Sequence, residues 1–331
     1  LSQIATTKDW NETMKVGFIG LGNVGAKLAG SLLRNGFDLT VRDLDSSATE
    51  EFSRLGARVA ASPKELAQHC DVIVTCLPSP AISASVIEGE NGVLAGLSEG
   101  NIWIEMSTTD AQEVQRLGAK VHEKGAFAAD CPVSGGCHRA ATGNIAIFAG
   151  CDRTIFDTVF PLLGAMGRQV LHTGPLGTAS ILKVVTNYLA TANLVSICEA
   201  LVTTETTGVD LATAYEAIKI SSGNSFVHET ESQVILNGSR DINFTMDLVL
   251  KDISLFQEIA ERGQVPLDIS PLLIKIFQDA QDRYGPREWS SNVIKRLEDA
   301  TGLVIRAPGF PAEIIDGEPE VLGQEVMVAQ D

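Results

Sequence analysis

The stretch Lys15-Val-Gly-Phe-Ile-Gly-Leu-Gly-Asn-Val-Gly25 decides how this chain folds. Val16 to Ile19 predict a short buried strand, and three glycines follow it with the spacing G-x-G-x-x-G. The first glycine permits a tight turn, the second lets the backbone approach a pyrophosphate, and the third lets a helix pack closely on the strand. A helix over residues 23–35 would then point its N-terminus at the phosphates. The cofactor-binding residues predicted from this turn are Gly20, Leu21, Gly22, Asn23, Val24 and Gly25.

A second predicted strand, residues 38–42, ends at Asp43, about twenty residues beyond the glycines. An acid at this position accepts hydrogen bonds from the ribose hydroxyls of the adenosine. Leu44 follows Asp43, at a position where an arginine would favour a 2′-phosphate. Arg42 precedes Asp43, and its side chain can point toward the ribose or away from it. The sequence therefore predicts NAD rather than NADP as the cofactor, with Asp43 as the ribose acceptor.

The length of the chain bounds its number of domains, and its net charge excludes some classes of binding partner. A chain of 331 residues is long enough for two domains with well-filled cores. The formal charge of −17 and the pI near 4.7 argue against nucleic acid and against anionic membrane surfaces as partners. A negatively charged substrate is repelled at long range, so a site for an acid must carry its own local positive potential.

The cysteines indicate a reducing compartment. The six cysteines are scattered and form no C-x-x-C pair, so we expect reduced core thiols in a cytoplasmic protein. Residues 1–14, predicted to be an N-terminal extension, are polar and mixed, which is not typical of a signal peptide. His138 beside Cys137 is a poor ligand pair for one ion, and no metal site is predicted.

Short apolar runs alternate with helical stretches up to residue 175, which indicates βαβ units and a doubly wound parallel sheet of the Rossmann type. The further strands are predicted at residues 58–60, 71–76, 101–105, 125–129, 144–149 and 169–172. Leu77-Pro78 and Met106-Ser-Thr-Thr109 follow two of these strands, so both segments should lie at the carboxyl edge of the sheet, where such sheets bind ligands.

The predicted strand at residues 125–129 leads into Asp130-Cys-Pro-Val-Ser-Gly-Gly136. A turn with two glycines and a hydroxyl can expose backbone amides as a nest for an anion. On local evidence a plain glycine-rich loop remains an alternative.

The organisation changes after Gly174-Pro-Leu-Gly177. No glycine or proline interrupts residues 178–207, which predicts one long helix that joins the Rossmann domain, residues 15–175, to an all-helical domain, residues 176–300. Lys183, Asn187, Asn193 and Glu199 argue against a membrane span. The apolar helix faces of the second domain suggest a partner subunit, and residues 301–331 are predicted to be a separate tail that wraps or frays.

Lys183 and Asn187 are four residues apart and so share one face of the long helix. A lysine on a long helix is usually a solvated surface charge. Burial beside a positively charged nicotinamide ring would instead favour the neutral amine and make it a usable acid or base.

The sequence resembles the β-hydroxyacid dehydrogenase family, which includes 3-hydroxyisobutyrate dehydrogenases and tartronate semialdehyde reductases. Four separated motifs, in the order of the family, carry the resemblance over about residues 15–298: Gly20-Leu-Gly-Asn-Val-Gly25, Asp130-Cys-Pro-Val-Ser-Gly-Gly136, Gly177-Thr-Ala-Ser-Ile-Leu-Lys183 with Asn187, and Lys251-Asp252.

The resemblance implies a hydride transfer between NAD and a small 3-hydroxy acid or its semialdehyde or keto form, in a homodimer or homotetramer. It implies that Lys183 is the general acid/base and that Asn187 orients the substrate. The substrate carboxylate would be held by Ser134, Gly135 and Gly136. The cofactor site would also contain Leu77, Pro78, Thr108 and Lys251.

Departures from the family pattern leave the substrate open. Arg139 stands where the family usually has glycine, and it either accepts a second anionic group of the substrate or forms a surface ion pair. Imine reductases typically replace the lysine, so Lys183 argues against that activity, whereas reduction of a sulfonate aldehyde stays open. A non-catalytic NAD-binding sensor is the alternative outside the enzymes.

Overall fold

The computed structural model describes residues 14–328, which fall into two compact units. The first unit runs up to Lys183 and also includes the segment from Asp316 onward, and the second is Val184–Ile315. The predicted extension, residues 1–14, lies outside the described residues except for Met14.

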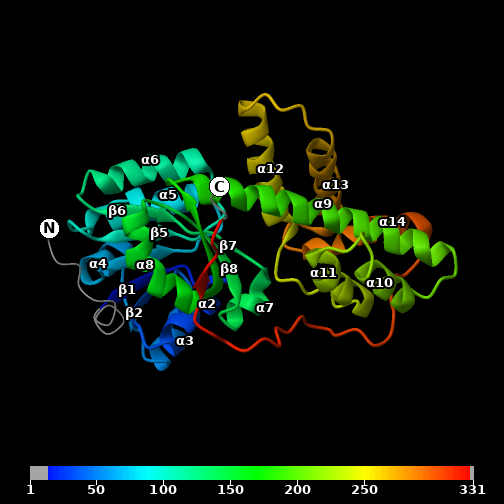
Figure 1. Ribbon diagram of the computed structural model, residues 1–331, viewed down its shortest axis with the longest axis horizontal. Helices are drawn as coiled ribbons and strands as arrows, with labels where there is room; N and C mark the ends of the chain where they lie inside the picture. Colours follow the sequence, from blue (N-terminus) through cyan, green and yellow to red (C-terminus); the bar gives the residue numbers. More distant parts are fainter. Residues whose placement is uncertain (1–13, 329–331) are drawn as a thin grey trace. The chain divides into compact units, whose positions relative to one another are not determined.

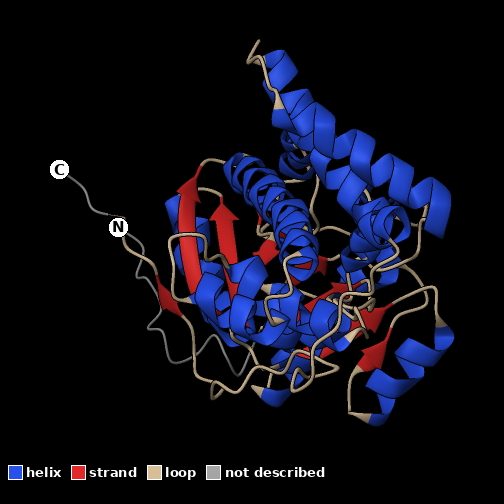
Figure 2. Cartoon of the chain, turned by 90° about the vertical axis from the view of Figure 1, so that its right-hand side faces the viewer, coloured by secondary structure: helices blue, strands red, loops and turns tan. Residues whose placement is uncertain are grey.

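One mixed sheet of ten strands forms the centre of the first unit (Figures 1 and 2). Its strands are β1 (Lys15–Ile19), β2 (Asp38–Arg42), β3 (Arg58–Val59), β4 (Val72–Thr75), β5 (Ile102–Glu105), β6 (Phe127–Asp130), β7 (Val133–Ser134), β8 (Ile145–Gly150), β9 (Gly167–Gly174) and β10 (Gln324–Glu325). The order is β10-β9-β8-β6-β5-β4-β1-β2-β3, with β7 paired to β8. The six neighbouring strands β3, β2, β1, β4, β5 and β6 are parallel to one another, as predicted. β8 runs antiparallel to β6.

Helices cover both faces of this sheet, because its central strands are apolar on both sides. They are α2 (Gly25–Arg34), α3 (Ser46–Arg54), α4 (Pro63–His69), α5 (Pro80–Glu88), the 3-10 turn η1 (Val93–Ala95), α6 (Ala111–His122), α7 (Gly136–Ala141) and α8 (Arg153–Met166). One apolar cluster joins the sheet to α2 and α8 around Phe18, Leu28 and Phe156. A second joins it to α4 and α6 around Leu66 and Leu117. The sheet is therefore doubly wound, as the sequence predicted.

The second unit is helical throughout. Its elements are α9 (Thr178–Thr206), which begins in the first unit, and then α10 (Leu211–Lys219), α11 (Phe226–Asn237), α12 (Met246–Arg262), α13 (Ile269–Tyr284), the 3-10 turn η2 (Ser290–Ile294) and α14 (Lys295–Thr301). Leu201, Ile253 and Phe277 belong to its apolar core. The 3-10 turn η2 leads directly into α14.

Among the described residues, α9 is long and apolar enough to cross a membrane by length and composition. One such helix is weak evidence, since core helices of soluble proteins meet the same criteria. Lys183 and Glu199 lie within α9. The boundary between the two units falls inside α9, at Lys183, and not near residue 175 as the sequence predicted.

The C-terminal segment wraps, which is one of the two predicted behaviours, but it is not separate: residues up to Ile315 belong to the second unit, and those from Asp316 onward belong to the first. β10 adds to the sheet in parallel with β9. Glu320 accepts hydrogen bonds from Arg34 Nε (3.1 Å) and from Ser31 Oγ (3.2 Å), and Glu325 forms an ion pair with Arg153 (2.6 Å). Acidic side chains of this segment thus meet basic side chains of α2 and α8.

Candidate active site

The glycine turn after β1 has the geometry of a dinucleotide cradle. A Cβ atom on Gly20 would lie 2.2 Å from the carbonyl oxygen of Cys76, and one on Gly25 would lie 2.0 Å from that of Gly20. Only glycine therefore allows β1, the turn and α2 to approach this closely. A Cβ on Gly22 would meet no atom within 4 Å. The backbone at Gly22 faces the open space that a pyrophosphate needs.

Asp43 lies directly beside this turn. Its Oδ2 accepts a hydrogen bond from the Leu21 amide (2.5 Å), and its Oδ1 accepts one from the Asp45 amide (2.8 Å). These two bonds fix the carboxylate next to the glycines. Leu44 projects into solvent with 93% of its surface exposed, and Arg42 Nη1 donates to the Asp43 carbonyl oxygen.

The loops after β4 and β5 are joined by a buried carboxyl group. The Leu77 amide donates to Ser107 Oγ (2.7 Å), and the Ser107 amide donates to Glu105 Oε1 (2.9 Å), which also accepts a bond from the Ser107 hydroxyl. Glu105 is 1% exposed, and burial raises the pKa of its carboxyl group, opposed by the bonds from Ser107. Glu105 thereby ties the loop of Leu77 and Pro78 to the loop of Thr108.

The predicted anion turn follows β7. Gly135 and Gly136 have φ angles of +127° and +87°, which other residues rarely adopt. A Cβ on Gly135 would lie 3.3 Å from Arg139 Cδ, and one on Gly136 would lie 2.8 Å from the His138 ring. The stem of Arg139 and the ring of His138 therefore lie against the turn that begins at Ser134. Burial lowers the pKa of His138, and the charge of Arg139 adds to this effect.

Lys183 lies in the second turn of α9 and is only 8% exposed. The start of α9 is held by Asp130, the last residue of β6. Asp130 Oδ1 accepts a hydrogen bond from the Gly177 amide (2.7 Å), and Oδ2 accepts bonds from the Ser180 amide (2.7 Å) and hydroxyl (2.8 Å). Asp130 thus connects the strand that leads into the anion turn with the helix that carries Lys183.

Three polar residues of the second unit form a local network. Asn187 Nδ2 donates to Asp252 Oδ2 (2.5 Å), and Lys251 Nζ forms an ion pair with Asp252 Oδ1 (2.7 Å). Asp252 is buried, so it fixes both neighbours in place. The Asn187 side chain is therefore oriented before any substrate arrives.

Most of the predicted site residues meet at one edge of the sheet. The glycine turn, Asp43, Leu77, Pro78 and Thr108 follow the carboxyl ends of β1, β2, β4 and β5. The anion turn comes four residues after β6. Asn187 and Lys251 belong to the second unit, where Asp252 brings them together. The roles of all these residues stay predictions.

Four residues with structural roles in the site were not predicted: Glu105, Ser107, Asp130 and Asp252. Ser107, Asp130 and Asp252 do stand inside sequence segments that point to the site: Met106-Ser-Thr-Thr109, Asp130-Cys-Pro-Val-Ser-Gly-Gly136 and Lys251-Asp252. Glu105 had no signal beyond its place at the end of a strand.

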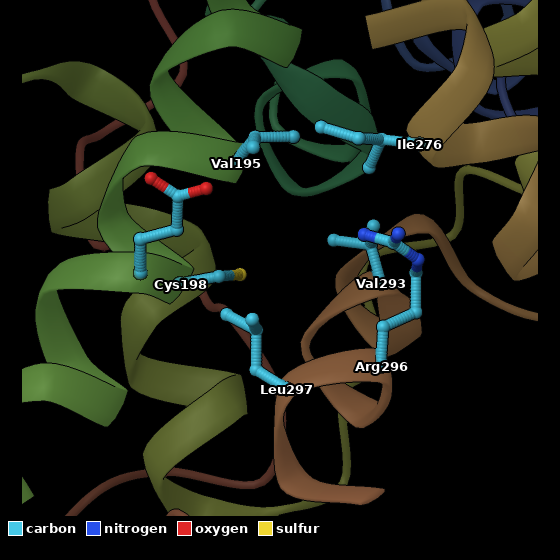
Figure 3. A pocket seen from close by; sticks show the side chains of 7 residues that line it. Val195, Cys198, Ile276, Val293, Arg296 and Leu297 are labelled. Atoms are coloured by element: carbon cyan, nitrogen blue, oxygen red, sulfur yellow. The ribbon is translucent and has the colours of Figure 1, made fainter. Parts of the chain in front are cut away.

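The described residues hold no group of three or more histidine, cysteine, aspartate or glutamate side chains arranged for a metal ion. The second unit contains a small hollow, with room for about one water molecule. Figure 3 shows its lining, which consists of Val195, Cys198, Glu199, Ile276, Val293, Arg296 and Leu297. No predicted site residue lines this hollow.

A parallel sheet of this order, with a glycine turn after β1 and an acid after β2, defines an NAD(P)-binding domain. Comparison with known families agrees. Residues 15–174 match the NAD binding domain of 6-phosphogluconate dehydrogenase, and residues 177–297 match the family described as NAD-binding of NADP-dependent 3-hydroxyisobutyrate dehydrogenase.

The matches with individual relatives extend over nearly the whole length of those proteins. A 2-(hydroxymethyl)glutarate dehydrogenase from Eubacterium barkeri is 32% identical over 295 residues, which are 89% of this chain and 98% of that protein. An NAD-dependent L-serine dehydrogenase from Pseudomonas aeruginosa is 30% identical over 87% of this chain and 98% of its own. The crystal structure of a 3-hydroxyisobutyrate dehydrogenase from Salmonella typhimurium is similar with a TM-score of 0.79 at 27% identity, over 86% of this chain and 99% of that one.

The chain belongs to the β-hydroxyacid dehydrogenase family. It is an NAD(P)-dependent oxidoreductase that acts on a CH–OH group.

Proposed function

We propose that this protein interconverts a small 3-hydroxy acid and its semialdehyde or keto form, with Lys183 as the general acid/base. One observation carries the proposal: Lys183 is 8% exposed on a helix that Asp130 anchors to the strand before the anion turn. A lysine this deeply placed is poorly suited to be a solvated surface charge.

The residues present fit a dinucleotide. Gly20 and Gly25 let β1, the turn and α2 pack closely, and Gly22 leaves space for the pyrophosphate. Asp43 is held beside this turn, where it would accept the ribose hydroxyls. The bound cofactor supplies the hydride acceptor in oxidation and the hydride donor in reduction.

Proton transfer falls to Lys183. In the oxidative direction the neutral amine removes the proton of the substrate hydroxyl as the carbonyl group forms. In the reductive direction the ammonium returns this proton to the carbonyl oxygen. Asn187, held by Asp252, would orient the substrate.

The anion turn provides the substrate carboxylate with an anchor. Ser134, Gly135 and Gly136 offer a hydroxyl and backbone amides, and Arg139 lies against the turn. Holding the carboxylate fixes which carbon faces the cofactor, and such positioning contributes several kcal/mol to the lowering of the barrier.

We further propose NAD as the preferred cofactor. A carboxylate that accepts ribose hydroxyls repels a 2′-phosphate. Asp43 is fixed by two backbone amides, and the neighbouring Arg42 guanidinium donates to the backbone carbonyl oxygen of Asp43.

We also propose a homodimer or homotetramer. Several apolar side chains of the second unit are about half exposed or more, among them Val209, Ile220, Val265, Ile269 and Leu272. Such surfaces often mark subunit contacts. Light scattering after gel filtration checks this point, since a single species of 35.2 kDa would contradict it.

The absorbance of the reduced cofactor tests the proposed substrate class directly. The panel contains 3-hydroxypropionate, 3-hydroxyisobutyrate, serine, glycerate and sulfonated analogues, with 2-hydroxy acids of the same size as controls, each with NAD and with NADP. We expect turnover with NAD on one cluster of 3-hydroxy acids and none on 2-hydroxy acids of the same size. Turnover of 2-hydroxy acids alone would overturn the proposal.

A further inference from the structure

Asp130 is the buried carboxyl group that links the anion turn with the helix of the proposed acid/base. We propose that Asp130 is a positioning residue for Lys183: its carboxylate fixes the first turn of α9 and thereby the place of the amine. This inference rests on the proposed role of Lys183.

The hydrogen bonds of Asp130 use both of its oxygens. Oδ1 binds the Gly177 amide, and Oδ2 binds the amide and the hydroxyl of Ser180, all at 2.7–2.8 Å. These donors belong to the first turn of a helix, where backbone amides have no acceptor within the helix. Lys183 follows Ser180 by three residues, so the same rigid turn sets the start of its side chain.

The surroundings leave this carboxylate little freedom. Asp130 is 0% exposed, and a Cβ on Gly150 would lie 2.3 Å from Asp130 Oδ1 and 3.1 Å from the Ala179 amide. Any side chain at position 150 would therefore displace the carboxylate from the helix.

An acid has an advantage over an amide at this position. The carboxylate accepts all three hydrogen bonds, and the positive end of the α9 dipole stabilises its charge. Asparagine has nearly the same shape, but its NH₂ group would face either the Gly177 amide or the two Ser180 donors. Asp130→Asn therefore changes the anchor without creating a cavity.

The test compares Asp130→Asn with Ser180→Ala and Lys183→Ala. We expect Asp130→Asn to lower kcat by about a hundredfold, since a displacement of about 1 Å can cost that much. Its KM for NAD should stay within about threefold of the wild type, because the glycine turn is untouched. Ser180→Ala keeps both backbone bonds to Asp130 and should lower kcat by no more than about threefold.

Gly150→Ala provides a second route to the same result. It keeps Asp130 but pushes its carboxylate away, so kcat should fall as in Asp130→Asn. Thermal unfolding and the stoichiometry of cofactor binding are measured for each variant, so that kcat refers to folded sites only.

The outcomes separate the two proposals. If Lys183→Ala is inactive while Asp130→Asn and Gly150→Ala keep wild-type kcat per folded site, Asp130 is merely structural and this inference is wrong. If Lys183→Ala keeps its activity, the proposed function of Lys183 is what fails.

Discussion

Asp43 is the residue on which the proposed preference for NAD depends. The Leu21 and Asp45 amides hold its carboxylate beside the glycine turn, and in the proposed site this negative charge would repel a 2′-phosphate. A fixed charge discriminates more strongly than a mobile one, because it cannot move away from the repelled group.

Replacing this charge should change the preference between NAD and NADP. We expect Asp43→Ser to lower kcat/KM for NAD by about tenfold, as one lost charge-assisted hydrogen bond implies, and to raise it for NADP. Asp45→Ala is the matched control, since its backbone amide still binds Asp43 and only the cap of α3 is lost. An unchanged NAD-to-NADP ratio in Asp43→Ser would refute the role of Asp43.

The carboxyl group of Asp130 should leave a signature in the pH dependence of stability. Burial raises its pKa from 3.8 to about 6, although the bonds from Gly177 and Ser180 oppose this. The folded chain therefore holds this proton more tightly than the unfolded chain, so stability falls as the pH rises from about 4 to 6. The neighbouring thiols of Cys131 and Cys151 also have raised pKa values and stay neutral in this range.

Chemical unfolding of the wild type and of Asp130→Asn at a series of pH values checks this sign. The wild type should lose up to about 3 kcal/mol relative to Asp130→Asn between pH 4 and 6. Parallel curves for the two proteins would show that Asp130 titrates normally in the folded state.

At the scale of elements, the sequence predicted the helices and strands that have strong local patterns. α6 and α11 begin at side-chain caps, since Asp110 and Ser225 accept bonds from the first turns of these helices. α7 escaped prediction because six residues after two glycines give no helical period. β10 escaped because Gln324-Glu325 has no apolar alternation and becomes a strand only through its distant partner β9.

The C-terminal segment should contribute measurably to stability. Glu320 binds Arg34 and Ser31 at once and is about one-third exposed, so Glu320→Ala should lower the free energy of unfolding by about 1 kcal/mol. Glu318→Ala removes one more exposed pair, with Arg168, and should cost less. Urea unfolding measures both variants, and equal losses would contradict a network centred on Glu320.

At the scale of the whole molecule, the net negative charge of the chain opposes the binding of an anionic substrate at the proposed site. A net charge of −17 repels an anionic substrate, so in the proposed site binding would depend on the local positive groups near the anion turn, Arg139 among them. The sequence predicted the glycine turn and Asp43 from spacing alone, because a glycine turn has a local pattern. Asn187 was singled out by its spacing to Lys183, whereas Lys251 was reached only through family resemblance, because Asp252 joins residues that are far apart in the chain.

The most direct test of Lys183 as the general acid/base is the turnover of Lys183→Ala on the best substrate of the panel, together with the affinity of this variant for the cofactor. Lys275→Ala, a change of an exposed lysine on α13, is the matched control. We predict that Lys183→Ala lowers kcat by at least about a hundredfold and leaves NAD binding within about twofold of the wild type, while the control is unaffected. A variant that keeps more than about a tenth of the wild-type kcat would contradict Lys183 as the acid/base.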